Sequence, residues 1–306
     1  MNNGEYLKIY VDFLKRFIDV KKPLRLVFDC SNGTAGIVLK KLVPLIHNSK
    51  FLILNSKPDG NFPAHGPNPL VRNALKRLGK SVRQYKADLG VAFDADADRV
   101  FFIDNVGRAL PSYVIAYLLF KNLPPPFVGE IFTYKTLKYV GLLEERKVYP
   151  SAVGTYFVRE MMRKKNANAA AEYSGHYFYR EFFGCDSGIL TALKVMNLVS
   201  KLPYSLADFY DFLPKFYTRL FNMPSRDKGR LMRKAKSFYK NKALKIEKID
   251  GLGFDFKDWF FVVRPSNTEP LLRFFVGAKN KAELRKRAKE IRKSLKTRKT
   301  QKTRKT

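Results

Sequence analysis

The chain has 306 residues, of which 45% are hydrophobic, 14% aromatic and 28% charged. These fractions are close to those of globular proteins and exclude collagen-like, disordered and disulfide-scaffold classes. Lys and Arg (59) outnumber Asp and Glu (27), and the net charge of +32 attracts polyanions, phosphorylated sugars and nucleic acids alike. The longest apolar run, residues 113–120, is far shorter than the roughly 20 residues that span a bilayer. Cys30 and Cys185 have no metal-ligand spacing and fit a reducing compartment. We therefore expect a cytoplasmic protein with no membrane partner.

The first part of the chain predicts an alternation of strands and helices. Apolar residues recur at three- and four-residue intervals over 5–18, which indicates an amphipathic helix. Strands are predicted at 24–29, 51–54 and 89–93, with helices from the 31–36 turn through 46 and near 71–83. A stiff loop rich in proline and glycine spans 58–69. This order predicts a mostly parallel sheet covered by helices.

A run of three prolines within residues 123–126 marks the clearest predicted boundary, because successive prolines cannot continue a helix. A second alternation follows, with strands at 127–132, 147–151 and 168–171 and helices at 136–144, 154–164 and from Ser187. The highly basic residues 219–242 are interpreted as a linker or a partly helical connection. A smaller α+β unit is predicted over about 243–294, before a low-complexity tail.

Three alternating aspartates, Asp94, Asp96 and Asp98, directly follow the strand predicted at 89–93. Carboxylates in this spacing can converge on one hard cation, and oxygen ligands suit Mg²⁺. A calcium-binding EF-hand is excluded, because the positions that need glycine and glutamate hold Arg99 and Asn105. The sequence therefore predicts a magnesium site, with a solvated acidic turn as the alternative.

A second polar loop contains Glu172, Ser174 and His176 around Gly175, after another short apolar strand. A carboxylate, a hydroxyl and an imidazole in this spacing can bind sugar hydroxyls, and the imidazole can move a proton near neutral pH. A purely structural turn is an equally good interpretation of these residues.

A third polar loop, residues 264–270, is followed by Arg273. It combines two arginines with hydroxyl, amide and backbone donors, which together suit a phosphate dianion. The alternative is an ordinary polar turn between strands.

In this order, the three loops resemble those of the α-D-phosphohexomutases, which include phosphomannomutase, phosphoglucomutase and phosphoglucosamine mutase. Residues 94–99 (DADADR) resemble the metal loop, 172–176 (EYSGH) the sugar loop and 264–270 (RPSNTEP) the phosphate loop. The resemblance covers about residues 5–295. It implies two consecutive α/β/α sandwich domains with mixed, mainly parallel sheets, followed by a smaller α+β C-terminal domain.

The resemblance also implies roles for the matching residues. Asp94, Asp96 and Asp98 would bind Mg²⁺, and Arg99 and His176 would be catalytic. The implied substrate-binding residues are Lys135, Gly154, Thr155, Glu172, Ser174 and His176. The implied phosphate-binding residues are Arg264, Ser266, Asn267, Thr268 and Arg273. The implied reaction interconverts hexose 1-phosphate and hexose 6-phosphate, of mannose or glucose, through a hexose bisphosphate and a phosphoserine.

Two alanines depart from the family pattern: Ala95 and Ala171 stand where glycine is usual. If either position needs a positive φ, alanine would be strained there by about 1 kcal/mol.

No segment resembles the T-A-S-H-N-type loop that carries the family's phosphoserine, and Ser31 fits better as part of the turn that opens the second domain. We interpret 1–20 as a helix left from a missing first domain, with its apolar face uncovered. The remaining predicted parts are domain II (21–121), domain III (122–215), a basic linker (216–242), domain IV (243–295) and a disordered basic tail (296–306).

The sequence thus predicts a phosphohexomutase chain without its nucleophilic serine, whose activity alone is in doubt. A separate chain with the serine domain would then be a partner. The alternatives are a non-catalytic sugar-phosphate-binding remnant and, least favoured, a nucleic-acid-binding protein.

Overall fold

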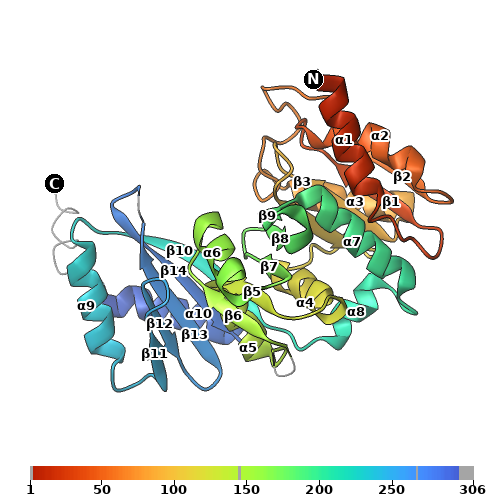
Figure 1. Ribbon diagram of the computed structural model, residues 1–306. Coiled ribbons are helices and arrows are strands. Elements are labelled where there is room, and N and C mark those ends of the chain that lie inside the picture. The colour runs from red at the N-terminus through yellow and green to blue at the C-terminus, as the bar shows by residue number, and fades with distance from the viewer. Residues whose placement is uncertain (1–2, 144–145, 267, 296–306) are drawn as a thin grey trace. The chain divides into compact units, whose positions relative to one another are not determined.

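The computed structural model describes residues 3–143, 146–266 and 268–295 (Figure 1). The chain divides into two compact units. Unit 1 comprises Met1–Val128, Arg146–Tyr149 and Arg159–Leu213, and unit 2 comprises Gly129–Glu145, Pro150–Val158 and Pro214–Thr306. None of the helices in the described ranges has the length and apolar character that a membrane span requires.

Unit 1 contains a four-stranded sheet of order β2-β1-β3-β4, formed by β1 (Arg25–Asp29), β2 (Lys50–Leu54), β3 (Leu89–Phe93) and β4 (Val100–Asp104). β1 pairs in parallel with β2 and β3, whereas β4 runs antiparallel to β3. Every residue of β3 and β4 is buried. Because the polar loop 94–99 joins these two strands, a rigid core holds both of its ends.

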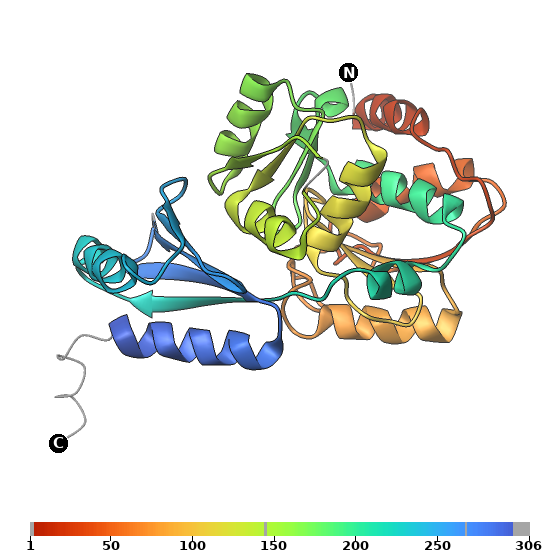
Figure 2. The ribbon, with the colours of Figure 1, turned by 90° about the horizontal axis from the view of Figure 1, so that it is seen from below.

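The helices of this sheet differ slightly from the sequence expectation. α2 (Ala35–Leu42) gives way to a 3-10 turn, Val43–Leu45, because Pro44 lacks the N–H that continues an α-helix. α3 (Ala74–Tyr85) begins later than expected, because Arg72 and Asn73 have left-handed φ values of 50° and 58°. Figure 2 shows α3 along its full length, and its buried Leu78 and Val82 join the core of the sheet.

A second sheet has the order β6-β5-β7-β8-β9. Its strands are β5 (Phe127–Glu130), β6 (Val148–Ser151), β7 (Ala169–Ala171), β8 (Tyr177–Tyr179) and β9 (Cys185–Asp186). The helices in this part of the chain are α4 (Ser112–Asn122), α5 (Ile131–Val140), α6 (Thr155–Lys165), the 3-10 turn Arg180–Phe182, α7 (Gly188–Lys201) and α8 (Leu206–Phe212). Of these, α7 packs against β3 and β4 of the first sheet. β8 pairs antiparallel with both β7 and β9.

The predicted strand 127–132 and helix 136–144 are wrong in their boundary. α5 already begins at Ile131, because the Glu130 carboxylate caps it by accepting hydrogen bonds from the backbone N–H groups of Phe132 (2.7 Å) and Thr133 (2.9 Å). It ends at Val140 and is capped by Gly141, whose φ is +75°.

The first helix, α1 (Asn3–Lys15), packs within unit 1. Leu14 is fully buried, and Phe13 lies 5.6 Å from the ring of Phe182, centroid to centroid. Tyr6 and Ile9 remain more than half exposed. The helix face that was expected to lack a cover is therefore covered in its C-terminal half.

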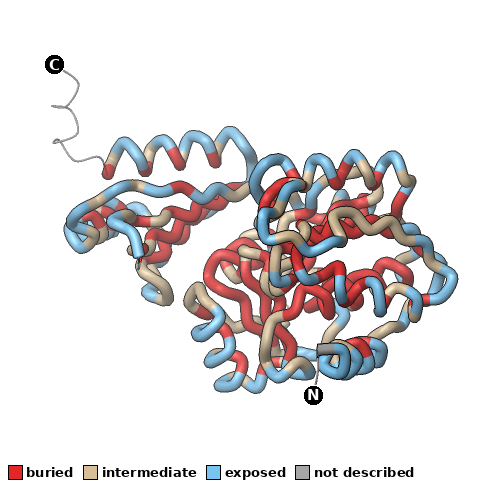
Figure 3. Tube along the Cα trace, turned by 90° about the horizontal axis from the view of Figure 1, so that it is seen from above, coloured by how far each residue is buried: buried red, intermediate tan, exposed pale blue. Residues whose placement is uncertain are grey.

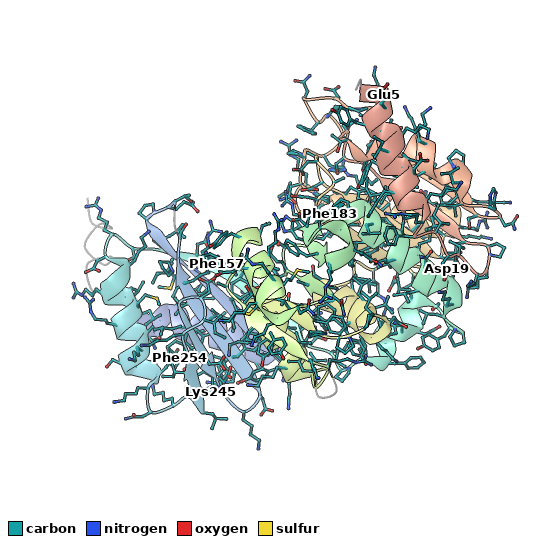
Figure 4. The ribbon with its side chains drawn as sticks, in the orientation of Figure 1. Glu5, Asp19, Phe157, Phe183, Lys245 and Phe254 are labelled. Atoms are coloured by element: carbon teal, nitrogen blue, oxygen red, sulfur yellow. The ribbon has the colours of Figure 1, made fainter. Side chains whose placement is uncertain are left out.

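Unit 2 is built on an antiparallel sheet of order β10-β14-β13-β12-β11. The strands are β10 (Tyr217–Pro224), β11 (Lys245–Glu247), β12 (Leu252–Asp255), β13 (Trp259–Pro265) and β14 (Leu271–Ala278). α9 (Lys228–Tyr239) and α10 (Lys281–Leu295) share one buried cluster with the sheet. Figure 3 shows buried residues along the strands and exposed outer turns on the helices. In Figure 4, Phe254 lies among these strands and Lys245 at the start of β11.

The interpretation of residues 216–242 as a linker is wrong, whereas the alternative of a partly helical segment is correct for α9. β10 pairs with β14 along its whole length, and Leu231, Ala235 and Tyr239 of α9 are buried against the sheet. The apolar residues recur every four positions and form one helix face, while the lysines and arginines occupy the other. High net charge therefore hid an amphipathic helix.

Candidate active site

The three aspartates lie on the loop between β3 and β4. The side chain of Asp94 is 1% exposed, whereas Asp96 is exposed. One carboxylate oxygen of each aspartate lies within 4.8 Å of the others. Within the described ranges, Oδ1 of Asp98 is buried and accepts no hydrogen bond. This set of oxygen donors, with an acceptor to spare, fits Mg²⁺.

Arg99 supplies a positive charge to the same loop. Its Nε lies 2.5 Å from Oδ2 of Asp94 and 3.7 Å from Oδ1 of Asp98. Burial raises the pKa of Asp94 to about 6, although the charge of Arg99 opposes this shift. A buried carboxylate is stabilised by a cation beside it, which Arg99 supplies and a divalent ion would supply more strongly.

Neither Ala95 nor Ala171 has the positive φ that would strain an alanine. Both are outside the set of non-glycine residues with a positive φ, whereas Ala97, in the middle of the metal loop, has a φ of +62°. The left-handed residue of this loop is therefore an alanine flanked by the aspartates.

The sugar loop is a hairpin between β7 and β8. Glu172 N–H donates to His176 O at 2.9 Å, and Gly175 N–H donates to Glu172 O at 3.1 Å. Gly175 has a φ of +95°, and a Cβ there would lie 2.9 Å from the ring of Phe101. Glycine is thus required both by the turn and by its close approach to β4.

The metal loop and the sugar loop are joined directly. Arg99 and His176 form an antiparallel β-bridge, and Val100 N–H donates to Gly175 O at 3.1 Å. His176 Nε2 lies 3.4 Å from Oδ2 of Asp98. The structure therefore brings two of the three predicted loops together in unit 1.

The imidazole of His176 lies between two carboxylates. Its Nδ1 is 3.0 Å from Oε2 of Glu172 and 2.8 Å from Oγ of Ser174. Burial lowers the pKa of His176, but hydrogen bonds with Asp98 and Glu172 outweigh it and raise the pKa to about 9. The two carboxylates thus favour the protonated imidazolium, which can donate a proton.

Sequence reasoning missed Asp186, which ends β9. Its carboxylate lies within 4.8 Å of ligand atoms of Asp98 and His176. Burial raises the pKa of Asp186. The available signal was its place at a strand end, directly before the Ser187 cap of α7.

The phosphate loop is the turn between β13 and β14 in unit 2. Arg264 and Arg273 are directly opposite each other on these strands. Arg264 Nε lies 3.0 Å from Oδ2 of Asp250, and Arg273 Nη2 lies 2.9 Å from Oε2 of Glu269. Like charges in directly opposite positions repel each other, which an anion between them would relieve.

The other residues predicted in this loop differ in exposure. Ser266 is 3% exposed, and its Oγ accepts a hydrogen bond from Glu269 N–H, whereas Thr268 is exposed. Asn267 lies outside the described residues. Lys228 was missed by sequence reasoning: its Nζ donates to the carbonyls of Ser266 (2.6 Å) and Glu269 (3.1 Å). It was missed because its segment was interpreted as a linker.

Gly154 and Thr155 precede and begin α6, also in unit 2. Thr155 is exposed, and Gly154 has a φ of +122°. The neighbouring Val153 N–H donates to Oδ2 of Asp250 at 3.2 Å, the same oxygen that pairs with Arg264. Asp250 thus links this turn to the phosphate loop, a link that nothing in the local sequence indicated.

Lys135 lies in a different environment from the other predicted binding residues. Its side chain is fully buried, with Nζ 2.6 Å from Oδ1 of Asp255 and 2.7 Å from Oε2 of Glu247. This arrangement is that of a structural ion pair.

Comparison with known proteins identifies a family. Three models of one family match successive segments: the phosphoglucomutase/phosphomannomutase α/β/α domain II (residues 8–107), α/β/α domain III (112–216) and C-terminal domain (220–294). The predicted fold class is confirmed by these matches.

Curated relatives agree with this match. A protein of Xanthomonas campestris pv. campestris named phosphohexose mutases is 34% identical over 284 residues, which are 90% of this chain and 63% of the relative. The phosphomannomutase of Vibrio cholerae is 31% identical, over 96% of this chain and 68% of the relative. The chain thus spans about two thirds of the length of these relatives.

Solved structures share the fold. A phosphoglucomutase/phosphomannomutase family protein of Burkholderia thailandensis has a TM-score of 0.82 at 24% identity, over 94% of this chain and 64% of that one. The N-acetylphosphoglucosamine mutase of Aspergillus fumigatus, solved with GlcNAc-6P and magnesium, has a TM-score of 0.66 at 14% identity, over 95% of this chain and 69% of that one. The chain belongs to the phosphoglucomutase/phosphomannomutase family and carries its domains II, III and IV.

Proposed function

We propose that this chain carries the metal-, sugar- and phosphate-binding loops of a phosphohexomutase, which interconverts hexose 1-phosphate and hexose 6-phosphate of mannose or glucose. The observation that carries the proposal is the Arg99–His176 bridge, with His176 Nε2 at 3.4 Å from Asp98 Oδ2. Phosphoryl transfer to a hexose needs a charge-neutralising site and a hydroxyl-binding site side by side. The relatives named phosphohexose mutases and phosphomannomutase support this reaction class.

In unit 1, Asp94, Asp96 and Asp98 would hold Mg²⁺, a metal that the Aspergillus mutase was solved with. When bound, the ion supplies positive charge for the transferring phosphoryl group. Glu172 and Ser174 would bind sugar hydroxyls. The His176 imidazolium would donate its proton to the oxygen that leaves the phosphoryl group, and Arg99 would add positive charge.

In unit 2, Arg264 and Arg273 would bind a phosphate group of the hexose phosphate. A dianion offers both guanidinium groups oxygen acceptors and removes their mutual repulsion. Ser266 and Thr268 contribute hydroxyls on the same turn, and Gly154 and Thr155 are linked to it through Asp250. Lys135 has no part in the proposed binding set, because both of its carboxylate partners hold its ammonium group.

The group that carries the transferable phosphoryl is expected outside residues 1–306, because no loop of the T-A-S-H-N type occurs in them. Ser31 is 1% exposed, and its Oγ donates to Phe93 O at 2.5 Å. Such a hydroxyl is not available as a nucleophile. A phosphoserine supplied by a further segment or chain would give and regain the phosphoryl group through a hexose bisphosphate.

Binding is tested first, by calorimetry of mannose 1-phosphate and glucose 1,6-bisphosphate with the 306-residue chain and Mg²⁺. Arg264→Ala should weaken binding about tenfold or more, because it removes a charge-assisted hydrogen bond to phosphate. Arg285→Ala, which removes an exposed arginine of α10, is the matched control and should leave affinity unchanged. Equal affinities of all three proteins, or no binding, would refute the proposal.

Catalysis is tested by a coupled assay of mannose 1-phosphate turnover. The chain alone should be inactive, and adding a phosphorylated serine domain from the Xanthomonas relative should give turnover that Asp94→Asn abolishes. Binding without any restored turnover would favour a non-catalytic sugar-phosphate-binding protein. Turnover by the chain alone would locate the nucleophile within residues 1–306.

A further inference from the structure

The carboxylate of Asp29, at the end of β1, is buried and fully engaged. Its Oδ1 accepts hydrogen bonds from Ser31 N–H at 3.0 Å and from Asn55 Nδ2 at 2.9 Å. His65 Nε2 lies 3.2 Å from Oδ1 and 3.0 Å from Oδ2. The side chains of His65 and Asp29 are only 2% and 5% exposed. Because Nε2 faces carboxylate oxygens alone, it is the ring nitrogen that carries the proton.

Asp29 holds the start of the 31–34 turn, whose backbone conformation is energetically unfavourable. Ser31 and Asn32 have φ values of 52° and 55°, a left-handed region that is unfavourable for residues with a side chain. Such a turn persists only where its surroundings determine it. The hydrogen bond from Ser31 N–H to the buried Asp29 carboxylate is one such determinant.

This turn in turn holds the metal loop on both sides of Asp94. Ser31 Oγ donates to Phe93 O at 2.5 Å, and Thr34 N–H donates to Ala95 O at 2.8 Å. A Cβ on Gly33 would lie 2.1 Å from Ala95 O, so that the approach is possible only for glycine. The carbonyl groups that flank Asp94 are therefore both bound by the 31–34 turn.

The stiff loop 58–69, which has no role in the proposed function, contacts both the 31–34 turn and Asp29. It is attached to the turn by Asp59 N–H, which donates to Asn32 O at 2.9 Å. His65 of this loop is buried, with only 3% of the residue exposed. The loop thus delivers His65 to Asp29.

The three residue types also occur in hydrolase triads, but the geometry excludes that chemistry. A triad histidine bonds the nucleophile with one nitrogen and the carboxylate with the other. In the described ranges, His65 Nδ1 has no hydrogen-bond partner, and Ser31 Oγ is committed to a backbone carbonyl.

We propose that His65 is a positioning residue for the metal loop. It fixes the orientation of the Asp29 carboxylate, Asp29 fixes the turn at Ser31, and the turn fixes the backbone on both sides of Asp94. The inference rests on the proposed function, because it takes Asp94 as a ligand of a divalent cation.

The test is the affinity of the full chain for Mn²⁺, a paramagnetic substitute for Mg²⁺, measured by electron paramagnetic resonance without substrate. His65→Leu should raise the Kd for Mn²⁺ about tenfold or more, as residues that orient metal ligands typically do. In His65→Gln, an amide nitrogen can take the place of Nε2, and the Kd should stay within about threefold of wild type. Ser31→Ala, which removes only the bond to Phe93 O, should also weaken binding and serves if His65→Leu does not fold.

Leu78→Ala is the matched control. Leu78 is buried in the core of the same sheet, on α3, so that its truncation destabilises unit 1 without removing a contact of the turn. Its Kd for Mn²⁺ should equal that of wild type at a similar loss of thermal stability. Weakening by Leu78→Ala as large as that by His65→Leu would overturn the inference, as would unchanged Kd values in His65→Leu and Ser31→Ala. Failure of the wild-type chain to bind Mn²⁺ would instead overturn the metal site of the proposed function.

Discussion

Replacement of Lys135 should measurably destabilise unit 2. Its ammonium group is fully buried and lies 2.6 Å from Asp255 and 2.7 Å from Glu247. Lys135→Met keeps the aliphatic volume and removes the charge. Removing one partner from a buried ion pair costs about 3–5 kcal/mol, because the remaining charge is left uncompensated.

The remaining contacts place the expected cost near the lower end of that range. After the substitution, Asp255 keeps Lys138 at 3.2 Å, and Glu247 keeps Lys245 at 2.7 Å. Both remaining lysines are largely exposed, with side chains 43% and 62% exposed, so that they compensate only in part. We therefore expect a loss of about 3 kcal/mol in the free energy of unfolding.

The assay is urea unfolding followed by tryptophan fluorescence. The chain has one tryptophan, and Trp259 lies buried in β13 of unit 2, so that its signal reports on this unit. Lys138→Met, which removes an exposed partner of the same Asp255, is the matched control and should cost less than about 1 kcal/mol. Equal losses in the two variants would refute the reasoning. A Lys135→Met variant of unchanged stability but weakened hexose-phosphate binding would make Lys135 a ligand, as the sequence resemblance implied.

The same ion pair has a signature in the acid range. Burial raises the pKa of Glu247, but hydrogen bonds from Lys135 and Lys245 outweigh it and hold the pKa at about 2, below the ordinary value of 4.5. Because the native state binds the proton more weakly than the unfolded chain, this contribution is complete above pH 4.5 and is lost as the pH falls towards 2. In Lys135→Met the pKa should rise, and the acid transition of Trp259 fluorescence should move to higher pH.

Three further predictions concern unit 1. Cys30 is fully buried, and burial raises the pKa of its thiol to about 12. Only Cys185 should therefore react with a thiol reagent in the native chain, and Cys30 should react only in denaturant. Two rapidly reacting thiols in the native chain would contradict the burial of Cys30. Ala97→Gly should relieve about 1–2 kcal/mol of left-handed backbone strain and lose about 0.8 kcal/mol from the buried methyl group. Urea unfolding followed by circular dichroism should therefore show a small increase in the free energy of unfolding, not a decrease. Arg108→Lys should destabilise the chain by about 2 kcal/mol or more in the same assay. The Arg108 guanidinium donates hydrogen bonds to the buried Asp104 and to both carboxylate oxygens of Asp211. Lysine cannot make these contacts together, because its ammonium group lacks the planar arrangement of donors.

The site loops could be predicted because their residues are contiguous. Asp94, Asp96 and Asp98 are adjacent enough for local spacing to bring their carboxylates together. The apolar strands before each loop were equally visible, since β3 and β7 are buried throughout. Local sequence therefore indicated the polar residues of these loops and the strand ends that carry them.

The partners of these loops could not be predicted, because they come from distant parts of the chain. Asp250 joins Val153 to Arg264 across about a hundred residues, and His65 reaches Asp29 from a loop 36 positions away. Such pairings depend on how the sheet brings strand ends together, which residue spacing does not encode. Composition also misled: the basic residues of α9 concealed its buried face, and with it Lys228 at the phosphate loop.

The two charged loops differ in how strongly the protein already neutralises them. Arg273 pairs with Glu269, whose side chain is 50% exposed, and such a pair contributes less than about 1 kcal/mol. A phosphate can therefore displace Glu269 at little cost. In the metal loop, the counter-charge to the buried Asp94 is Arg99, at 2.5 Å, and a cation that binds Asp94 must share it with this guanidinium or move it. Removal of Arg99 should therefore strengthen metal binding to the loop, whereas removal of Glu269 should barely change phosphate binding. The opposite pair of results would mean that the internal ion pairs organise the loops and do not compete with their ligands.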